Sequence, residues 1–515
     1  MHHGRERSVG MSVAREHEVV VLGGGPAGCA AAAFLAAKGH DVCVVRPQAP
    51  PAGGLAESVP PSARRVLSEL GLDDALERAG FLANRGNLVW WAGGTSHSEV
   101  FGDGHLGFHT DRSRLEEVLV AAAREAGATI RNGASARDAE ELTGEWRIGC
   151  ARAAGEPFEL RAPWLLDATG RRGVIARREG REPDRGTTTT ALVSRWRRPG
   201  GFDDAPSTHT LVESYLDGWA WSVPLAEDVR CITVMVDQRH TDLESDLDGT
   251  LAVELAKAPH VAALCSGAEP VGRTWACPAS LYTARRFARP GLLLVGDAAS
   301  FIDPLSSFGV KKALCSGWLA GVTVHTALVD AGMCDAAVGL YDEREREVYR
   351  SYRGLAAEFF EEAARAYEHP YWETRAVAAR RAAGRRAAPV GDPDVPGTEV
   401  PAGDVRAAFE LIRARERLGA RRGAHVRVLE RPTVVGHRIV RERHLVSSRV
   451  PLGLRYVRNV DLCRLVDVAP RHDDVPDGWS AYNAGAPAVA LPDYLTALAT
   501  AFATGLLEHE SGATS

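Results

Sequence analysis

Apolar residues near the start of the chain follow a pattern that predicts a strand, a helix and a second strand. The run "EVVVL" (18–22) is continuously apolar after its first residue, as in a strand buried on both faces. A glycine turn and an alanine-rich helix follow in "GGGPAGCAAAAFLAAKG" (23–39), and "HDVCVV" (40–45) is typical of the next strand. The alternation predicts a βαβ unit with parallel strands.

The remaining pattern divides the chain into an α/β part, an antiparallel sheet and a helical end. Four strand-like runs separated by short breaks, "TTTTALVSRWRRP", "THTLVESYL", "GWAWSVPL" and "VRCITVMVD", predict an antiparallel sheet inserted in the α/β part. From Tyr341 the pattern becomes helical, and a Pro/Gly-rich break interrupts it. We expect a discontinuous Rossmann-type domain (15–180 and 270–340), an inserted sheet domain (85–105 and 187–270), a helical lid (341–387), a linker (388–403) and a mostly helical C-terminal region (404–515).

Composition argues against several classes of protein. The net charge of −6 over 515 residues, with no basic block that contains aromatic residues, argues against a nucleic-acid partner. The nine cysteines form no CxxC pair and no metal-ligand spacing, so we expect neither a disulfide framework nor a metal. The first eighteen residues lack the apolar stretch of a signal peptide, and no apolar run is long enough to span a membrane. We therefore expect a cytoplasmic protein.

The glycine turn carries the first chemical motif. Gly23, Gly25 and Gly28, with Ala27 between the last two, form a GxGxxG pattern that follows a strand and opens a helix. Such glycines permit a tight turn, the approach of a pyrophosphate and close helix packing, and the N–H groups at the helix start favour phosphate. Dinucleotide binding is the prediction. The second strand ends in Arg46 instead of the usual acidic residue, which leaves the choice of dinucleotide open.

Two later segments narrow that choice. "LLDATG" contains Asp167 and Gly170, and "GLLLVGDAASFIDPLSSFGV" contains Gly296-Asp297 and Phe308-Gly309. In this order, the three motifs resemble the FAD monooxygenases with the p-hydroxybenzoate hydroxylase fold. The resemblance implies FAD as cofactor, with Asp297 on the ribityl chain. It also implies that Arg112 lies against the cofactor.

Two segments point to one branch of that family. "GWAWSVP", with Trp219 and Trp221, is similar to the Gly-Trp-x-Trp-x-Ile-Pro segment of flavin-dependent halogenases, and "FIDPLSSFGV" resembles their Asp-Pro turn. The resemblance implies that the tryptophan strand separates flavin from substrate. On residues alone, the same two tryptophans could equally fill the core of a sheet.

The residue that would define halogenation is missing. Halogenases carry a lysine where this chain has Asn84 in "LANRGNLVWWAG", and tryptophan halogenases carry a glutamate where it has Ser306. An amide is not appreciably nucleophilic, and only four lysines occur in the chain. The chain also resembles lysine-lacking members that hydroxylate tryptophan, in "RGNLVWWAG", "DPLSSFG" and "ESVPPS". Glu57 and Ser58 in the last of these segments are expected near the flavin.

The resemblance therefore implies an FAD-dependent hydroxylase of an indole or phenol, free or bound to a peptide or carrier. Dioxygen would be the co-substrate, reacting through a flavin C4a-hydroperoxide. Electrons would come from NAD(P)H directly or from a flavin reductase, because no second GxGxxG follows a strand. Three alternatives stay open: a halogenase that uses Lys311 or Lys312, a flavin dehydrogenase or reductase, and a non-catalytic FAD-binding maturation partner. His105 and His109 are candidate proton acceptors near neutral pH.

Overall fold

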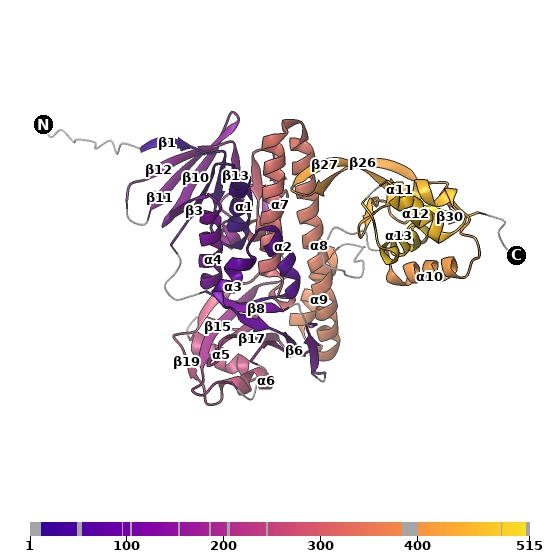
Figure 1. The fold of residues 1–515 in the computed structure, drawn as a ribbon. Coiled ribbons are helices and arrows are strands. Elements are labelled where there is room, and N and C mark those ends of the chain that lie inside the picture. Colours follow the sequence, from indigo (N-terminus) through magenta and orange to yellow (C-terminus); the bar gives the residue numbers. More distant parts are fainter. Residues whose placement is uncertain are drawn as a thin grey trace. The chain divides into compact units, whose positions relative to one another are not determined.

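Six strands form the sheet that the first βαβ unit predicts (Figure 1). The computed structural model describes residues 12–510 except 49–53, 95, 103–105, 153–154, 185–186, 203–206, 244–245, 384–399 and 486. The strand order is β22-β23-β13-β2-β3-β9, parallel except for β22. The strands are β2 (Val19–Leu22), β3 (Val42–Arg46), β9 (Thr129–Asn132), β13 (Trp164–Asp167), β22 (Ala288–Arg289) and β23 (Leu292–Leu294).

Three helices pack together beside this sheet, namely α1 (Pro26–Ala37), α4 (Arg112–Glu125) and α7 (Gly309–Val329). Helix α7 lies close against α1 because two of its glycines leave room. A Cβ on Gly317 would lie 2.2 Å from the carbonyl oxygen of Ala27, and one on Gly321 would lie 2.7 Å from the ring of Phe34. The N-terminal ends of α1 and α7 are thereby held beside the same part of the sheet.

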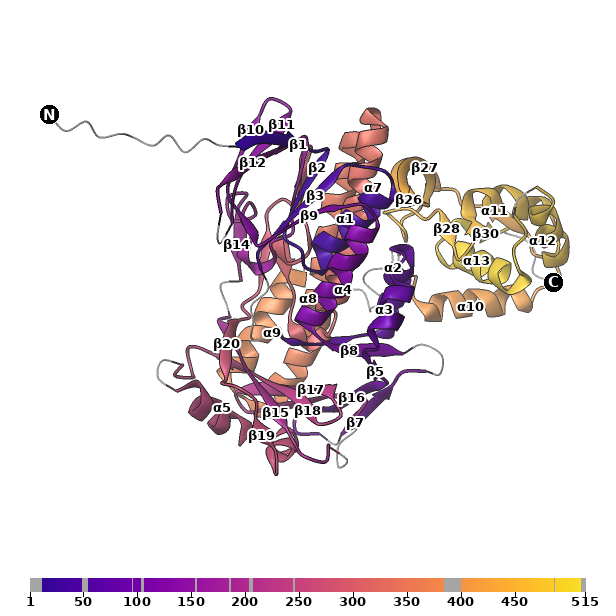
Figure 2. The same ribbon diagram turned by 60° about the vertical axis from the view of Figure 1, so that its left-hand side comes forward.

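Smaller sheets surround this core (Figure 2). One has the order β1-β12-β11-β10 and another β14-β21-β24, while β4-β8-β5 lies near the larger sheet described below. The strands are β1 (Ser12–Glu16), β4 (Ala56–Val59), β5 (Leu82–Asn84), β8 (Gly107–Asp111), β10 (Ala134–Leu142), β11 (Glu145–Arg152), β12 (Phe158–Ala162), β14 (Arg181–Pro183), β21 (Tyr282–Ala284) and β24 (Ser300–Phe301); short helices α2 (Arg64–Glu69) and α3 (Asp73–Ala79) follow β4.

The four strand-like runs form the centre of an eight-stranded sheet. Its order is β19-β15-β18-β17-β16-β6-β7, with β20 also paired to β15, and β6 joins β16 in parallel. One face packs on α5 and α6, and the other carries an aromatic cluster. The elements are β6 (Gly86–Trp90), β7 (His97–Val100), β15 (Thr189–Arg197), β16 (His209–Tyr215), β17 (Gly218–Ala226), β18 (Val229–Asp237), β19 (Glu269–Pro270), β20 (Trp275–Pro278), α5 (Leu247–Leu255) and α6 (Pro259–Ala262).

Helices α8 (Cys334–Tyr367) and α9 (Pro370–Ala383) fall in the region expected to form a lid. Figure 1 shows them side by side, and they make the most extensive contact between any two elements. Trp372 is fully buried and donates its indole N–H to the carbonyl of Tyr215, 3.0 Å away. The two helices are therefore packed into the sheet through a tryptophan with no solvent-exposed surface.

Residues 395–515 form a second compact unit, separate from residues 1–394. Its helices are the expected feature, but six strands accompany them among the described residues, and the sequence analysis does not predict these strands. Most of the expected linker lies outside the described residues, and its last two residues open the first helix. The elements are α10 (Ala402–Arg413), α11 (Leu462–Val468), α12 (Val475–Asn483), α13 (Leu491–Ala503), β25 (Ala420–Arg422), β26 (Arg427–Val435), β27 (Arg438–Val446), β28 (Tyr456–Val457), β29 (Val460–Asp461) and β30 (Leu507–His509).

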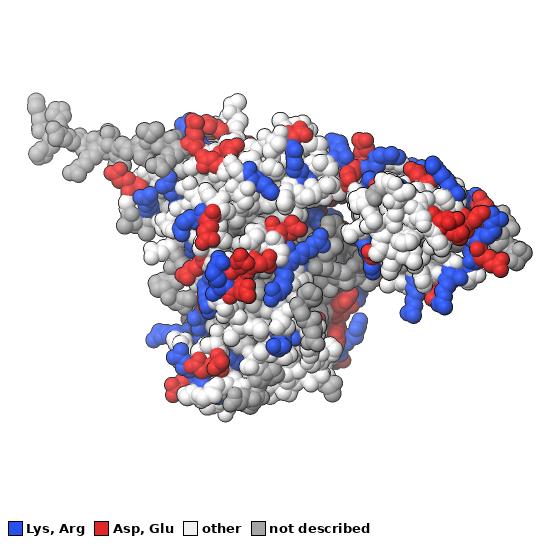
Figure 3. Space-filling model, viewed as in Figure 1, with Lys and Arg blue, Asp and Glu red and all other residues white. Residues whose placement is uncertain are grey.

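Basic and acidic side chains alternate over the face drawn in Figure 3, without a large area of one sign. Among the described residues, no group of three or more His, Cys, Asp or Glu side chains is arranged to hold a metal ion. No described helix combines the length and the apolar character needed to cross a membrane.

Candidate active site

The glycine turn between β2 and α1 has the geometry that a pyrophosphate site requires. Gly23 has φ of +105°, and a Cβ there would lie 2.2 Å from the carbonyl oxygen of Ala168. A Cβ on Gly28 would lie 2.0 Å from the carbonyl oxygen of Gly23. At Gly25, by contrast, the nearest atom to an added Cβ is 3.5 Å away. Gly23 and Gly28 therefore allow the tight turn, while a Cβ on Gly25, at the start of α1, would make only ordinary van der Waals contact with the side chains of Glu116 and Arg112.

Ala27 and Arg46 fit closely around this turn. A Cβ on Gly296, which has φ of +62°, would lie 2.7 Å from the methyl group of Ala27. Arg46 is 9% exposed, and its Cδ would lie 2.8 Å from a Cβ on Gly24. The arginine thus packs its aliphatic stem on the turn, where an acidic residue is usual.

Asp167 is engaged within the protein. Its carboxylate accepts hydrogen bonds from the backbone N–H groups of Thr169, Ile175 and Ala176 and from the Thr169 hydroxyl, and the residue is fully buried. These four donors give Asp167 a role in shaping the loop that contains Gly170, which has φ of +60°. A contact between Asp167 and the cofactor stays a prediction.

Asp297 lies beside a lysine that comes from α7. Lys312 is 1% exposed, and its Nζ lies 3.5 Å from Oδ1 of Asp297 and donates to the carbonyl of Ser300 at 2.6 Å. Oδ1 is buried and accepts no hydrogen bond within the described structure. A buried carboxylate oxygen without a donor is costly, so this atom is suited to accept from a bound hydroxyl such as one of a ribityl chain.

Arg112 links the start of α4 to β4. Its Nη1 donates to Oε1 of Glu57 at 2.8 Å, and its Nε donates to Oε1 of Glu116 at 3.0 Å. Its Nη2 would lie 3.8 Å from a Cβ on Gly25. Burial raises the pKa of Glu57, although the Arg112 guanidinium opposes the change. Burial alone would lower the pKa of Arg112, but Glu57 and Glu116 raise it. The guanidinium therefore stays charged at the edge of the glycine turn.

These features fit FAD. Four features occur around one turn: a glycine where an added Cβ would not clash, the N-terminus of α1, the charged guanidinium of Arg112, and an Asp297 oxygen that accepts no hydrogen bond within the described residues. Gly25 and α1 would accept the pyrophosphate, and Asp297 would accept from a ribityl hydroxyl.

Side chains of strand β4 point alternately to two sides of the strand, and these two sides differ chemically. Glu57 contacts Arg112, whereas Ala56 packs in the aromatic cluster that contains Trp219. Ser58 alternates with Glu57 and so faces the Ala56 side. Its Oγ accepts from Nδ2 of Asn84 at 2.9 Å and from Oγ1 of Thr210 at 2.8 Å. The residue in the place of the halogenase lysine is thus part of a hydrogen-bonded network, and it is 1% exposed.

His109, one of the two candidate proton acceptors, belongs to the same network. Nε2 lies 3.0 Å from Oγ1 of Thr210, and the residue is 1% exposed. Burial, together with Arg230 and His209, lowers the pKa of His109 to about 3. Such a group does not accept a proton near neutral pH. His105 lies outside the described residues.

Trp219 and Trp221 lie on one face of β17 and stack, with ring centroids 4.9 Å apart. Trp219 is 2% exposed and belongs to the cluster formed by Phe360, Tyr371 and Trp372 from α8 and α9. Trp221 is partly buried at the edge of the same cluster. The inner tryptophan therefore has a packing role, and the outer one has free surface.

At the start of α7, the two lysines are buried, which differs from the expectation for this segment. Ser307 has φ of +54°, and Phe308 turns its ring toward Tyr352 with centroids 5.4 Å apart. Lys311 is 2% exposed and lies 5.2 Å from the Phe308 ring. The sequence favours solvated lysines at this helix start, but Lys311 and Lys312 are both buried. Contacts from Phe308 and Gly309 to the cofactor stay predictions.

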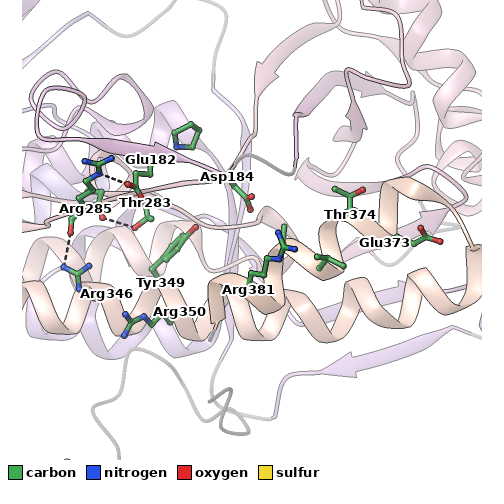
Figure 4. Close-up of a pocket in the computed structure, with 14 residues that line it drawn as sticks. Glu182, Asp184, Thr283, Arg285, Arg346, Tyr349, Arg350, Glu373, Thr374 and Arg381 are labelled. Carbon is green, nitrogen blue, oxygen red and sulfur yellow. Dashed lines mark hydrogen bonds and ion pairs between the residues drawn. The ribbon is translucent and has the colours of Figure 1, made fainter. Parts of the chain in front are cut away.

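A cleft of about 890 Å³ lies between β14, β21, α8 and α9 (Figure 4). It contains none of the predicted site residues. Its charged lining is largely compensated, since Arg285 pairs with Glu182, Arg346 with Asp342, and Asp184 with Arg353. The residues that the sequence predicts for the site lie at the glycine turn and on β4, and not in this cleft.

The sequence analysis does not predict two residues of the site, Glu116 and Thr210. Glu116 is one helical turn after Arg112, a spacing that could have indicated an ion pair. Thr210 gave no signal, because its partners come from other strands. Lys312 enters the sequence analysis only as a replacement for the missing lysine.

Comparisons with known proteins identify the family. The sequence model of the FAD binding domain matches residues 16–315, from β1 into α7. The chain belongs to that FAD-binding family. Among curated relatives, a tryptophan 2-halogenase of Chondromyces crocatus is 28% identical over 389 residues, covering 72% of each protein. A 1H-pyrrole-2-carbonyl-[peptidyl-carrier protein] chlorinase of Pseudomonas fluorescens is 26% identical over 61% of this chain and 76% of its own length.

Solved structures resemble the whole chain. The flavin-dependent halogenase CmlS has a TM-score of 0.74 at 21% identity, with 96% of each chain covered. The peptidyl tryptophan dihydroxylase QhpG has a TM-score of 0.66 at 23% identity, over 95% of this chain and all of QhpG. The α/β fold with an inserted sheet and the membership of the halogenase-like branch are confirmed. The chain is an FAD-dependent oxidoreductase of the halogenase-like kind.

Proposed function

We propose that the chain is an FAD-dependent monooxygenase that hydroxylates an electron-rich aromatic ring, an indole or a phenol. The observation that carries the proposal is the state of Asn84. Its Nδ2 donates to Ser58, its Oδ1 accepts from the backbone N–H of Gly86, and the residue is 1% exposed. An amide held in this way offers no free amine to receive and deliver an oxidised halogen.

Neither buried lysine of α7 supplies that amine. Nζ of Lys312 is engaged by Ser300 and Asp297 on the side predicted to hold FAD, and Lys311 lies against Phe308. Hydroxylation needs no lysine. FAD, when bound and reduced, supplies activation of dioxygen.

The protein's own residues would bind the cofactor, orient the substrate and exclude water. Arg112 and Glu57 hold the edge of the glycine turn, and Asp297 offers an oxygen for a ribityl hydroxyl. Trp221 has free surface beside the Trp219 cluster, where it would cover one side of the substrate and restrict access of water to the reacting centre.

Substrate delivery and electron supply belong to the same proposal. The acceptor is either free or bound to a peptide or a carrier protein, as the names of a peptidyl tryptophan dihydroxylase and a carrier-protein chlorinase suggest for relatives. Electrons come from NAD(P)H or from a separate flavin reductase, and we place the protein in the cytoplasm.

One experiment separates the proposal from its alternatives. Purified protein with FAD is reduced, mixed with dioxygen and supplied with indoles and phenols, with and without chloride or bromide. We expect a product that gains one oxygen atom, unchanged by halide. A halogenated product would establish a halogenase instead, and removal of hydrogen from the substrate without incorporated oxygen would indicate a dehydrogenase.

A halogenase is the second candidate, because the curated relatives named above are halogenases. A non-catalytic FAD-binding partner would give no product with any aromatic compound, yet would still bind FAD. The same reaction mixture therefore tests all four functions.

A further inference from the structure

Ser58 ends a chain of hydrogen bonds that begins at His109. Oγ1 of Thr210 donates to Oγ of Ser58 at 2.8 Å. Because the single hydroxyl hydrogen of Thr210 is used there, Thr210 can only accept from Nε2–H of His109, at 3.0 Å. This requires the tautomer of His109 with a bare Nδ1, the buried ring nitrogen that has no partner in the described structure. The direction of the chain is thereby fixed, from His109 to Thr210 to Ser58.

The same reasoning limits what the Ser58 hydroxyl can still do. A hydroxyl has two acceptor lone pairs and one hydrogen. Both lone pairs of Ser58 are taken, one by Thr210 and one by Nδ2 of Asn84 at 2.9 Å. Only the hydrogen remains, so Ser58 can donate to a further group and cannot accept from one.

The position of Ser58 determines which group that would be. On β4 it lies on the Ala56 side, which packs in the Trp219 cluster, and opposite to Glu57 and Arg112. Its partner Thr210 shares a strand face with Val212, which pairs with Trp221. The free hydrogen of Ser58 therefore lies on the tryptophan side of β4, away from Arg112.

We propose that Ser58 donates this hydrogen to an oxygen of the bound aromatic substrate, and that the substrate is therefore a phenol and not an indole. A phenol or phenolate oxygen accepts a hydrogen bond, whereas an indole N–H only donates. Against Ser58, an indole N–H would meet a hydroxyl that has no lone pair left. Ser58 determines specificity, and Thr210, Asn84 and His109 act through it as positioning residues. The inference rests on the proposed function, because it names the class of substrate for that site.

The test measures binding without turnover, by calorimetric titration of the FAD-loaded protein with 4-methylphenol and with 3-methylindole. We expect 4-methylphenol to bind about tenfold more tightly, the effect of one hydrogen bond of about 1.4 kcal/mol. Ser58→Ala should remove this preference. Thr210→Val should shift the ratio of the two affinities further than Ser58→Ala does. It frees one lone pair of Ser58 to accept from an indole N–H, so binding of 3-methylindole should improve relative to binding of 4-methylphenol. A merely structural role for Thr210 would not produce that gain.

A matched control is Ser222→Ala. Ser222 is a fully buried serine of β17, in the same sheet as Thr210, but it accepts from Arg230, and its neighbour in sequence, Trp221, faces the aromatic cluster. This variant should keep the tenfold ratio. Equal binding of the two probes to the unmodified protein, no saturable binding of 4-methylphenol, or an unchanged ratio in folded Thr210→Val would each overturn the inference. Absence of a hydroxylated product would instead count against the proposed function, because the titration needs neither reductant nor dioxygen.

Discussion

Trp219 and Trp221 stack with their ring centroids 4.9 Å apart and an angle of 25° between the ring planes. The two residues differ in what surrounds them, since Trp219 is 2% exposed among aromatic side chains from α8 and α9 while Trp221 is only partly covered. One short strand thus carries a tryptophan that holds the sheet to its helices and another that can contact a ligand.

Trp221→Ala should separate oxidation of the reduced flavin from product formation. Removing the indole would open one side of the reacting centre, so water would enter and hydrogen peroxide would replace most of the product. Reoxidation of the flavin should stay near its normal rate. The measurement is the ratio of hydrogen peroxide to hydroxylated product in one reaction. Trp221→Phe, which keeps an aromatic ring, should retain most of the coupling.

Trp219→Ala should act on stability instead. Truncating a fully buried tryptophan leaves a cavity, and we expect a loss of about 3–5 kcal/mol in the free energy of unfolding. Urea unfolding measures this loss. If Trp221→Ala still converted most of the oxidised flavin into hydroxylated product, Trp221 would have only the packing role that Trp219 has.

Gly25→Glu should abolish FAD binding without unfolding the protein. An added Cβ at Gly25 has no neighbour closer than 3.5 Å, so the backbone tolerates a side chain, but a carboxylate would lie where the pyrophosphate must approach. Gly25→Ala should fold and keep part of the affinity. Flavin fluorescence during titration with FAD measures the effect. Full affinity in Gly25→Glu would be inconsistent with a pyrophosphate at this turn.

Lys312→Met should destabilise the protein and leave the type of product unchanged. The substitution removes the ion pair with Asp297 and the hydrogen bond to Ser300, at a cost of about 2 kcal/mol. Lys312→Arg should recover part of the loss. Thermal unfolding with and without FAD measures stability, and product analysis in bromide tests the chemistry. If bromination occurred in the unmodified protein and disappeared in Lys312→Met, Lys312 would be a halogenating lysine.

The features that the sequence predicts well depend on local geometry. Gly23 is needed for its φ of +105°, and Gly28 because a Cβ there would lie 2.0 Å from the carbonyl oxygen of Gly23, so the motif reports its own backbone conformation. The same holds for Trp219 and Trp221, whose spacing places them on one face of any strand.

The features that the sequence does not predict depend on distant partners. Thr210 and Ser58 are 152 positions apart, and no pattern within either segment indicates their hydrogen bond. Lys312 is charged and close to a helix start, which favours a solvated side chain, but tertiary packing buries it beside Asp297. The pKa of His109 likewise depends on burial by other strands, which an isolated histidine in a sequence does not reveal.

His109→Gln should make the protein less sensitive to acid. His109 has a pKa of about 3 in the folded protein and about 6.5 ordinarily, so at pH 7 it is neutral in the folded protein and mostly neutral in the unfolded chain. As the pH falls below 6.5, the unfolded chain takes up a proton that the folded protein refuses until about pH 3. Stability therefore falls with falling pH, by about 1.4 kcal/mol per pH unit from this one group.

Glutamine keeps an N–H donor for Thr210 but does not titrate, so this contribution should vanish in His109→Gln. Urea unfolding at a series of pH values between about 4 and 7 measures the slope of stability against pH for both proteins. We expect the two slopes to differ by about one proton below pH 6 and to coincide near pH 7. Equal slopes throughout would mean that folding does not lower the pKa of His109, so that the folded protein takes up the proton in the same pH range as the unfolded chain. Nε2–H would still donate to Thr210 in that case, so the direction of the chain from His109 to Ser58 would not change.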